Sequence, residues 1–298
     1  MANLAYTVAD SGILLKLVKI ALIGALLCTA FFIREPVVVK SYIYKVFREA
    51  SKTRLMWQTR GWEEIKGPHF IVRYQAPDDD NANMVLDTAE KNYQPVVDKF
   101  DFTPKRKTLI VIYPTKESLG RSFGWAADES AMGVYWAGVI RVLSPKVWID
   151  EHDPLDFTAV FETEGPMVHE FTHLMVDYAT GGNYTRWFTE GIAQFEEEKL
   201  TGYLIGERNI TSSDQLYPLS RMDREFDNLS DQNLAYFQSY QAVYYLVSQY
   251  GEENLNKILQ NLGSGKTMDE SFQSVLGVSV DRFEHDFQNW IVGQQSRN

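Results

Sequence analysis

The segment His169-Glu170-Phe171-Thr172-His173 has the residue types and the spacing for metal chemistry. Side chains four positions apart share one face of a helix, so both imidazoles can bind a single ion. Glu170 lies beside them, where its carboxylate can take a proton from a water that the ion activates. The segment therefore predicts metal-assisted hydrolysis, with a peptide bond as the expected target.

A third ligand is expected from Glu190, seventeen positions after His173. Its neighbours Trp187, Phe188, Ile192 and Ala193 make this stretch largely apolar, and a buried carboxylate needs a partner such as a metal ion. The only cysteine of the chain is Cys28, far from this region, so histidine, aspartate or glutamate must hold the ion. The sequence predicts one Zn²⁺ bound by His169, His173 and Glu190.

These two segments together resemble the gluzincin metallopeptidases, and within them the peptidase MA-like group. The pattern of that group is HExxH followed by W-x-x-E-G-x-A, which residues 169–173 and 187–193 match. The resemblance extends more weakly over about residues 65–295, through segments 235–251 and 277–290. It implies a zinc ion, a thermolysin-like architecture and endo- or aminopeptidase activity, with Glu170 activating the attacking water.

Further site residues are expected around the ligands. Gluzincins usually supply a Tyr or His donor to the oxyanion, and the resemblance leaves Tyr236 and Tyr240 as candidates for this catalytic role, with core packing as the alternative. Groups that orient the histidines should lie one or two turns away. The candidates are Asp177, Gln194 and Glu197, which could equally be exposed helix residues.

A strand before the active-site helix binds extended substrate in zincins, by pairing with it along a sheet edge. The matching residues are Gly133, Val134, Tyr135 and Trp136. The alternative is an ordinary edge strand whose aromatic side chains face solvent.

The elements that must position these residues follow from hydrophobic periodicity and from breakers. Strands are expected at 69–74, at 108–113 and as one or two strands within 131–143. Helices are expected from 78, at 116–123, at 157–178 with a break at 165–166, at 184–200, and at 233–250, 252–262, 268–276 and 280–292. This order predicts an α+β fold with a helical C-terminal lobe. With the resemblance, it implies a thermolysin-like zincin domain of a mixed sheet plus the active-site helix.

The charge of the chain is divided unevenly. The 298 residues carry a net charge of -11, which makes nucleic acid an unexpected partner. Residues 34–60 hold seven basic and two acidic side chains, a net charge of +5, whereas residues 61–298 carry -17. A short basic neck therefore joins an acidic body. The neck is either a juxtamembrane helix that meets anionic lipid head groups or a solvated linker.

The N-terminal segment is apolar enough to suggest a membrane anchor. Residues 13–33 form an apolar run that only Lys16 and Lys19 interrupt, long enough to span a bilayer if both lysines reach the interface. The alternatives are a signal peptide cleaved near 28–30 and a buried helix. Basic residues after the run favour a cytoplasmic body. The lysines before it and the family resemblance favour an extracytoplasmic one, which we expect.

We therefore expect three regions: an anchor or signal segment at 1–34, a basic linker or helix at 35–60, and a metallopeptidase domain at 61–298. The expected function is zinc-dependent hydrolysis of peptide or protein substrates at a membrane, with lipid contacted through the anchor and the neck. Two alternatives are a zincin fold that only binds a partner and a zinc amidase that acts on a non-peptide bond.

Overall fold

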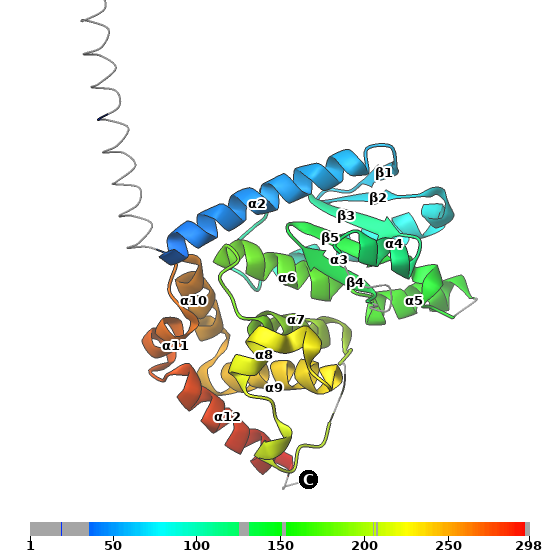
Figure 1. The fold of residues 1–298 in the computed structure, drawn as a ribbon. Helices are drawn as coiled ribbons and strands as arrows, with labels where there is room; N and C mark the ends of the chain where they lie inside the picture. The colour runs from blue at the N-terminus through cyan, green and yellow to red at the C-terminus, as the bar shows by residue number, and fades with distance from the viewer. Residues whose placement is uncertain are drawn as a thin grey trace, which may run out of the picture.

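The computed structural model describes Lys19 and residues 36–124, 131–150, 153–204, 206 and 208–295. A five-stranded mixed sheet forms the centre of the first half, in the order β1-β2-β3-β5-β4 (Figure 1). Its strands are β1 (Glu63–Lys66), β2 (Phe70–Tyr74), β3 (Thr108–Tyr113), β4 (Gly133–Trp136) and β5 (Val139–Leu143). β2, β3 and β5 are parallel, and the outer strands β1 and β4 are antiparallel to their neighbours.

The two faces of the sheet are covered by different helices, as the alternation of β3 shows. Ile110 and Ile112 belong to the main core, with α3 (Asp79–Val97) and the active-site helix α6 (Met167–Thr180). Leu109 and Val111 face a second, smaller cluster that contains Leu55 of α2 (Pro36–Gln58). The remaining helices of this half are α4 (Lys116–Arg121) and α5 (Pro154–Glu164), with short 3-10 turns at Ala76–Asp78 and Pro145–Val147.

The second half is helical, as the sequence predicted, and lies below α6 in Figure 1. It consists of α7 (Arg186–Thr201), α8 (Leu219–Glu225), α9 (Gln232–Tyr250), α10 (Glu252–Gly263), α11 (Met268–Leu276) and α12 (Val280–Gln295), with 3-10 turns at Ser213–Gln215 and Phe226–Asn228. The predicted α+β fold with a mixed sheet is confirmed. The short strand β1 and the helix α8 were not predicted, because both stretches are too short to show a clear period.

The basic neck is a continuous helix that packs on the body. α2 runs across the top of the molecule in Figure 1, over α6 and toward β1. Its Arg48 forms a buried ion pair with Asp177 of α6, and its Leu55 packs on the sheet. The expected anchor at 1–34 lies outside the described residues, apart from Lys19. Within the part of the chain that the structure describes, each helix is too short or too polar to cross a bilayer.

The helix α7 lies unusually close to α9 at one glycine. A Cβ built on Gly191 would lie 2.2 Å from the carbonyl oxygen of Ser239 and 2.6 Å from a methyl carbon of Val243. A Cβ does not approach backbone atoms so closely, so any larger residue must push the two helices apart. Gly191 therefore sets the distance between α7, which carries Glu190, and α9.

Gly191→Ala is expected to lower the free energy of unfolding by about 1–3 kcal/mol, the usual penalty for overpacking a close contact. Urea unfolding followed by circular dichroism would measure it. Gly293→Ala is the matched control, since a Cβ there meets nothing within 4 Å, and it should leave stability unchanged or slightly raised. Equal stability of the Gly191→Ala protein and the unsubstituted protein would contradict the close approach.

Candidate metal centre

The helix α6 presents the two histidines from a stretch with defined ends. It begins directly after Gly165 and Pro166, where the proline sits as the N-cap. It ends at Gly181, whose φ of 64° is the left-handed conformation that glycine adopts readily at helix ends. His169 and His173 lie one turn apart within these limits, as the sequence predicted.

Three ligand atoms converge between α6 and α7. The Nε2 atoms of His169 and His173 lie 3.0 Å apart, and each lies 3.3 Å from Oε2 of Glu190. One potential ligand atom from each residue falls within 4.8 Å of the others, which is the spacing of a metal site. Glu190 and His173 are buried, with exposed fractions of 1% and 8%, and His169 is half-buried. The structure therefore brings together the three residues predicted as ligands.

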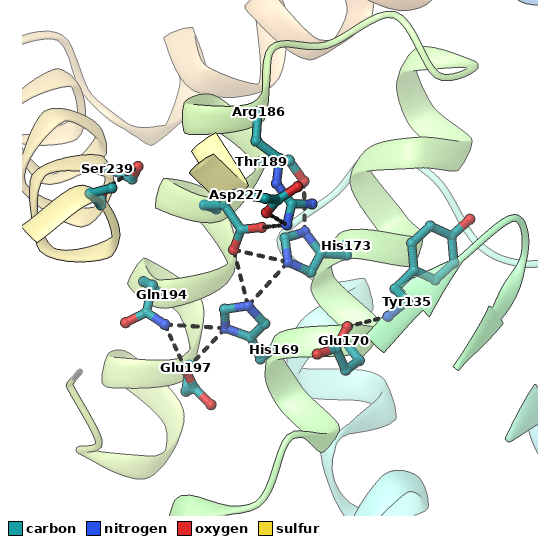
Figure 2. A network of polar contacts seen from close by, with 12 residues as sticks. Tyr135, His169, Glu170, His173, Arg186, Thr189, Gln194, Glu197, Asp227 and Ser239 are labelled. Carbon is teal, nitrogen blue, oxygen red and sulfur yellow. Dashed lines mark hydrogen bonds and ion pairs between the residues drawn. The ribbon is translucent and has the colours of Figure 1, made fainter. Parts of the chain in front are cut away.

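The other nitrogen of each imidazole is already held by a neighbour (Figure 2). Nδ1 of His169 lies 3.1 Å from Oε2 of Glu197, and Nδ1 of His173 lies 2.7 Å from Oγ1 of Thr189. When each Nδ1 carries the proton and donates it to these oxygens, each Nε2 keeps its lone pair for a metal ion. Gln194 adds a longer contact of 3.4 Å from its amide to Nδ1 of His169.

One oxygen of the Glu190 carboxylate forms an ion pair, whereas the other accepts no hydrogen bond within the described part of the chain. Its Oε1 pairs with Arg186 one turn earlier, at 3.1 Å. Its Oε2 accepts no hydrogen bond from the described residues, although it is buried. Burial would raise the pKa of Glu190, but Arg186 and the two histidines hold that pKa well below its usual range. An ionised, buried oxygen that faces two imidazole nitrogens fits a divalent cation.

The field around the histidines also favours a positive charge. Burial lowers the pKa of His169, but the nearby carboxylates of Glu197 and Glu190 outweigh it and raise that pKa well above its usual range. A metal ion would compete with protons for these imidazole nitrogens, and the same carboxylates would stabilise its positive charge.

Glu170, one position after His169 on α6, points toward the edge strand β4. Its carboxylate accepts a hydrogen bond from the main-chain N–H of Tyr135, as Figure 2 shows. Burial raises the pKa of Glu170 above its ordinary value. Gly133 lets the strand approach this closely, because a Cβ there would lie 2.5 Å from Cβ of Pro166 and 2.9 Å from Cγ of Glu170.

The edge strand β4, which carries the residues predicted to bind substrate, lies beside the candidate site. β4 forms one edge of the sheet and pairs with β5 on one side only. Gly133, Val134 and Tyr135 are half-buried, whereas Trp136 is 40% exposed. The side with the N–H of Tyr135 faces Glu170, so the free edge runs beside the candidate base.

Asp177 lies near the histidines in sequence but contacts other groups. Its carboxylate pairs with Arg48 of α2 at 3.0 Å and accepts a hydrogen bond from the hydroxyl of Tyr135. Nδ1 of His173, which Asp177 was expected to orient, instead lies against Thr189. Asp177 therefore ties α6 to α2 and β4.

The two candidate tyrosines on α9 have different neighbours. Burial raises the pKa of Tyr236, with the charge of Glu190 as the next cause, and its ring packs edge-on against that of Phe226. Burial raises the pKa of Tyr240 to about 12, with Glu198 and Tyr244 as the next causes. Of the two, Tyr236 is the one whose pKa is raised by the charges of Glu190 and Glu170.

Sequence reasoning did not identify Thr189 or Arg186. Both belong to the helix of Glu190, at one position and one turn before it, and their types gave no signal by themselves. The spacing alone could have placed Arg186 beside Glu190, since residues four apart on a helix are neighbours. Thr189 meets His173 only through the packing of α6 against α7, which depends on the tertiary structure.

Residues 156–293 match the family model described as the Peptidase MA superfamily. The matched segment runs from α5 to α12 and includes all three ligand residues and Glu170. No curated protein matches the chain. The similarity to peptidase MA proteins that the two motifs indicated is thereby confirmed, and it points to a peptidase-like hydrolase.

Thr189→Val should weaken zinc binding roughly 10- to 100-fold, the usual effect of removing a group that orients a ligand histidine. The valine keeps the shape of the side chain but leaves the Nδ1 proton of His173 without an acceptor. Thr172→Val is the matched control, because the buried hydroxyl of Thr172 has no hydrogen-bond partner among the described residues. Competition with a chelator would measure both affinities. Equal zinc affinities of the two variants would contradict the role of Thr189.

Proposed function

We propose that the chain is a membrane-anchored zinc peptidase whose reaction takes place between α6, α7 and β4. The observation that carries this proposal is the convergence of two Nε2 atoms and one carboxylate oxygen, with both Nδ1 atoms already taken. A Zn²⁺ ion held by His169, His173 and Glu190 would supply Lewis acidity for the scissile carbonyl and lower the pKa of a bound water.

Glu170 acts as the general base in this proposal. Its carboxylate takes a proton from the attacking water and gives the proton to the leaving amine. Burial raises its pKa, so the carboxylate accepts a proton more readily than an exposed glutamate would. Neither oxygen of Glu170 belongs to the group of metal ligands.

A peptide substrate would lie along the free edge of β4, extended and antiparallel or parallel to the strand. Main-chain hydrogen bonds along such an edge hold a peptide without reading its sequence. Residues 133–136 are the part of the edge nearest to Glu170. This arrangement supports peptide and protein chains as the substrate class.

Tyr236 is the proposed donor to the oxyanion that develops on the scissile carbonyl. A phenol with a raised pKa stays protonated and can donate a hydrogen bond over the working pH range. Tyr240 is assigned to packing, since its ring lies 6.0 Å from that of Tyr244 and its neighbouring charge is Glu198.

The membrane anchor and the location of the body belong to the proposal as well. The apolar run at 13–33 supports an anchor, and the family resemblance supports a catalytic domain outside the cytoplasm. Protease protection on sealed membranes would establish the orientation, independently of any activity.

Glu170→Gln should lower the rate of hydrolysis of a peptide library roughly 10²–10⁴-fold, because the amide cannot take the proton from water. The full chain in detergent, loaded with zinc, should retain the metal in this variant, which elemental analysis would measure. Glu164→Gln is the matched control, a glutamate at the end of α5 outside the site. A full chain that binds no zinc, or a Glu170→Gln variant that hydrolyses peptides as well as the unsubstituted protein, would contradict the proposed enzyme.

Tyr236→Phe should lower kcat roughly 10²- to 10³-fold, the usual loss when one oxyanion donor is removed. Zinc content and KM should change little, since the phenol acts on the transition state. Tyr240→Phe on the same helix is the control and should retain kcat. If both variants keep full activity, or if Tyr240→Phe is the slower one, the assignment of Tyr236 is wrong.

A further inference from the structure

The helix α2 packs against the body on one side and exposes apolar residues on the opposite side. Its packed side includes Tyr44, Arg48 and Leu55, which face α6 and the sheet. Its outer side exposes large apolar residues whose exposed fractions are 70% for Tyr42, 57% for Ile43, 55% for Val46, 47% for Phe47 and 64% for Trp57. At 3.6 residues per turn these five positions fall on one face, roughly opposite the packed one.

An exposed apolar stripe of this kind marks an interaction surface. The stripe continues onto the body, because the ring of Phe47 lies edge-on to that of Trp136, with centroids 5.7 Å apart. Trp136 ends the strand β4, so the surface reaches from the neck to the edge of the candidate active site. We call the outer residues of α2 and Trp136 together the outer face.

The charges around the outer face identify the kind of partner. Lys40, Lys45, Arg54 and Arg60 are exposed along or just after α2, against one exposed acidic residue of the helix, Glu49. A second copy of α2 would bring the same positive charge into contact, which disfavours a symmetric dimer here. Anionic lipid head groups complement the charge, and aromatic residues favour the boundary between head groups and acyl chains.

The position of α2 in the chain agrees with a lipid partner. α2 begins at Pro36, three positions after the apolar run at 13–33 ends. A chain that leaves a bilayer at the end of such a run reaches α2 at the level of the head groups. Amphipathic helices with basic and aromatic residues lie flat in this zone.

We propose that the outer face of α2, together with Trp136, lies on an anionic lipid surface. The proposal rests on the anchor in the proposed function and not on the hydrolytic reaction. Beyond the anchor, the proposal states that the neck helix α2 lies on the lipid surface. It also states that the edge of β4 that would bind substrate lies beside the lipid.

Spin labels on the full chain in vesicles would test this docking. In a background with Cys28→Ser, single cysteines at Ile43 and Val46 would carry labels on the outer face, and one at Tyr244 would be the control. Tyr244 is 43% exposed on α9, which lies at the opposite end of the molecule from α2 in Figure 1. Accessibility to oxygen and to a water-soluble nickel chelate would be measured in phosphatidylcholine vesicles with and without phosphatidylglycerol.

Labels at 43 and 46 should gain oxygen accessibility and lose nickel accessibility in the anionic vesicles, while the label at 244 should not. Lys45→Gln combined with Arg54→Gln should reduce this difference. Arg224→Gln combined with Lys257→Gln, with the same change in net charge on the body, should leave it unchanged. Circular dichroism of each variant would verify that it folds.

Other results would overturn the docking. Labels at 43 and 46 that stay open to nickel on a chain that floats with the vesicles would contradict it and leave the anchor intact. Spin–spin broadening between copies would replace lipid with a second copy as the partner. A chain that does not float with vesicles at all would contradict both the docking and the anchor, whereas a test of hydrolysis would be unaffected.

Discussion

The buried carboxylate of Glu190 is the constraint on which the rest of the structure depends. An ionised oxygen with no hydrogen-bond donor is unstable inside a protein unless positive charge meets it. Arg186 supplies that charge to one oxygen, and the other faces the two imidazoles of α6. The pairing of α6 with α7 is therefore compatible with burial only when a cation, either a proton or a metal ion, lies between the helices.

The surrounding elements fix this pairing from both sides. On the far side of α7, Gly191 lets α9, the helix that carries Tyr236, approach within contact of the backbone. On the far side of α6, Arg48 of α2 holds Asp177, which also binds the hydroxyl of Tyr135. The neck, the edge strand and the active-site helix thus meet at a single buried carboxylate. A displacement of α2 would be transmitted to β4 through two hydrogen-bonded side chains.

Local patterns in the sequence were sufficient for most of the helices and for the three candidate ligands, because those depend on spacing within one element. The break at 165–166, the strand 108–113 and the helix of Glu190 all followed from periodicity and breakers. The partners of Asp177 could not be predicted in this way, since Arg48 lies 129 positions earlier and meets it only after α2 has packed. Thr189 and the choice between Tyr236 and Tyr240 likewise depend on how helices dock, which no single segment encodes.

The hydrogen bond between Glu170 and the main chain of Tyr135 has a consequence for the order of events at the site. In an antiparallel pair, the N–H and C=O groups of a residue point to the same side, so those of Tyr135 both face the free edge of the sheet. An arriving peptide strand needs the same N–H that the carboxylate of Glu170 already occupies. Binding of the peptide at this register would displace the carboxylate of Glu170, which is the proposed base. The peptide would then replace Glu170 at the N–H of Tyr135 in one exchange. Until a substrate binds, Glu170 would stay hydrogen-bonded to the strand.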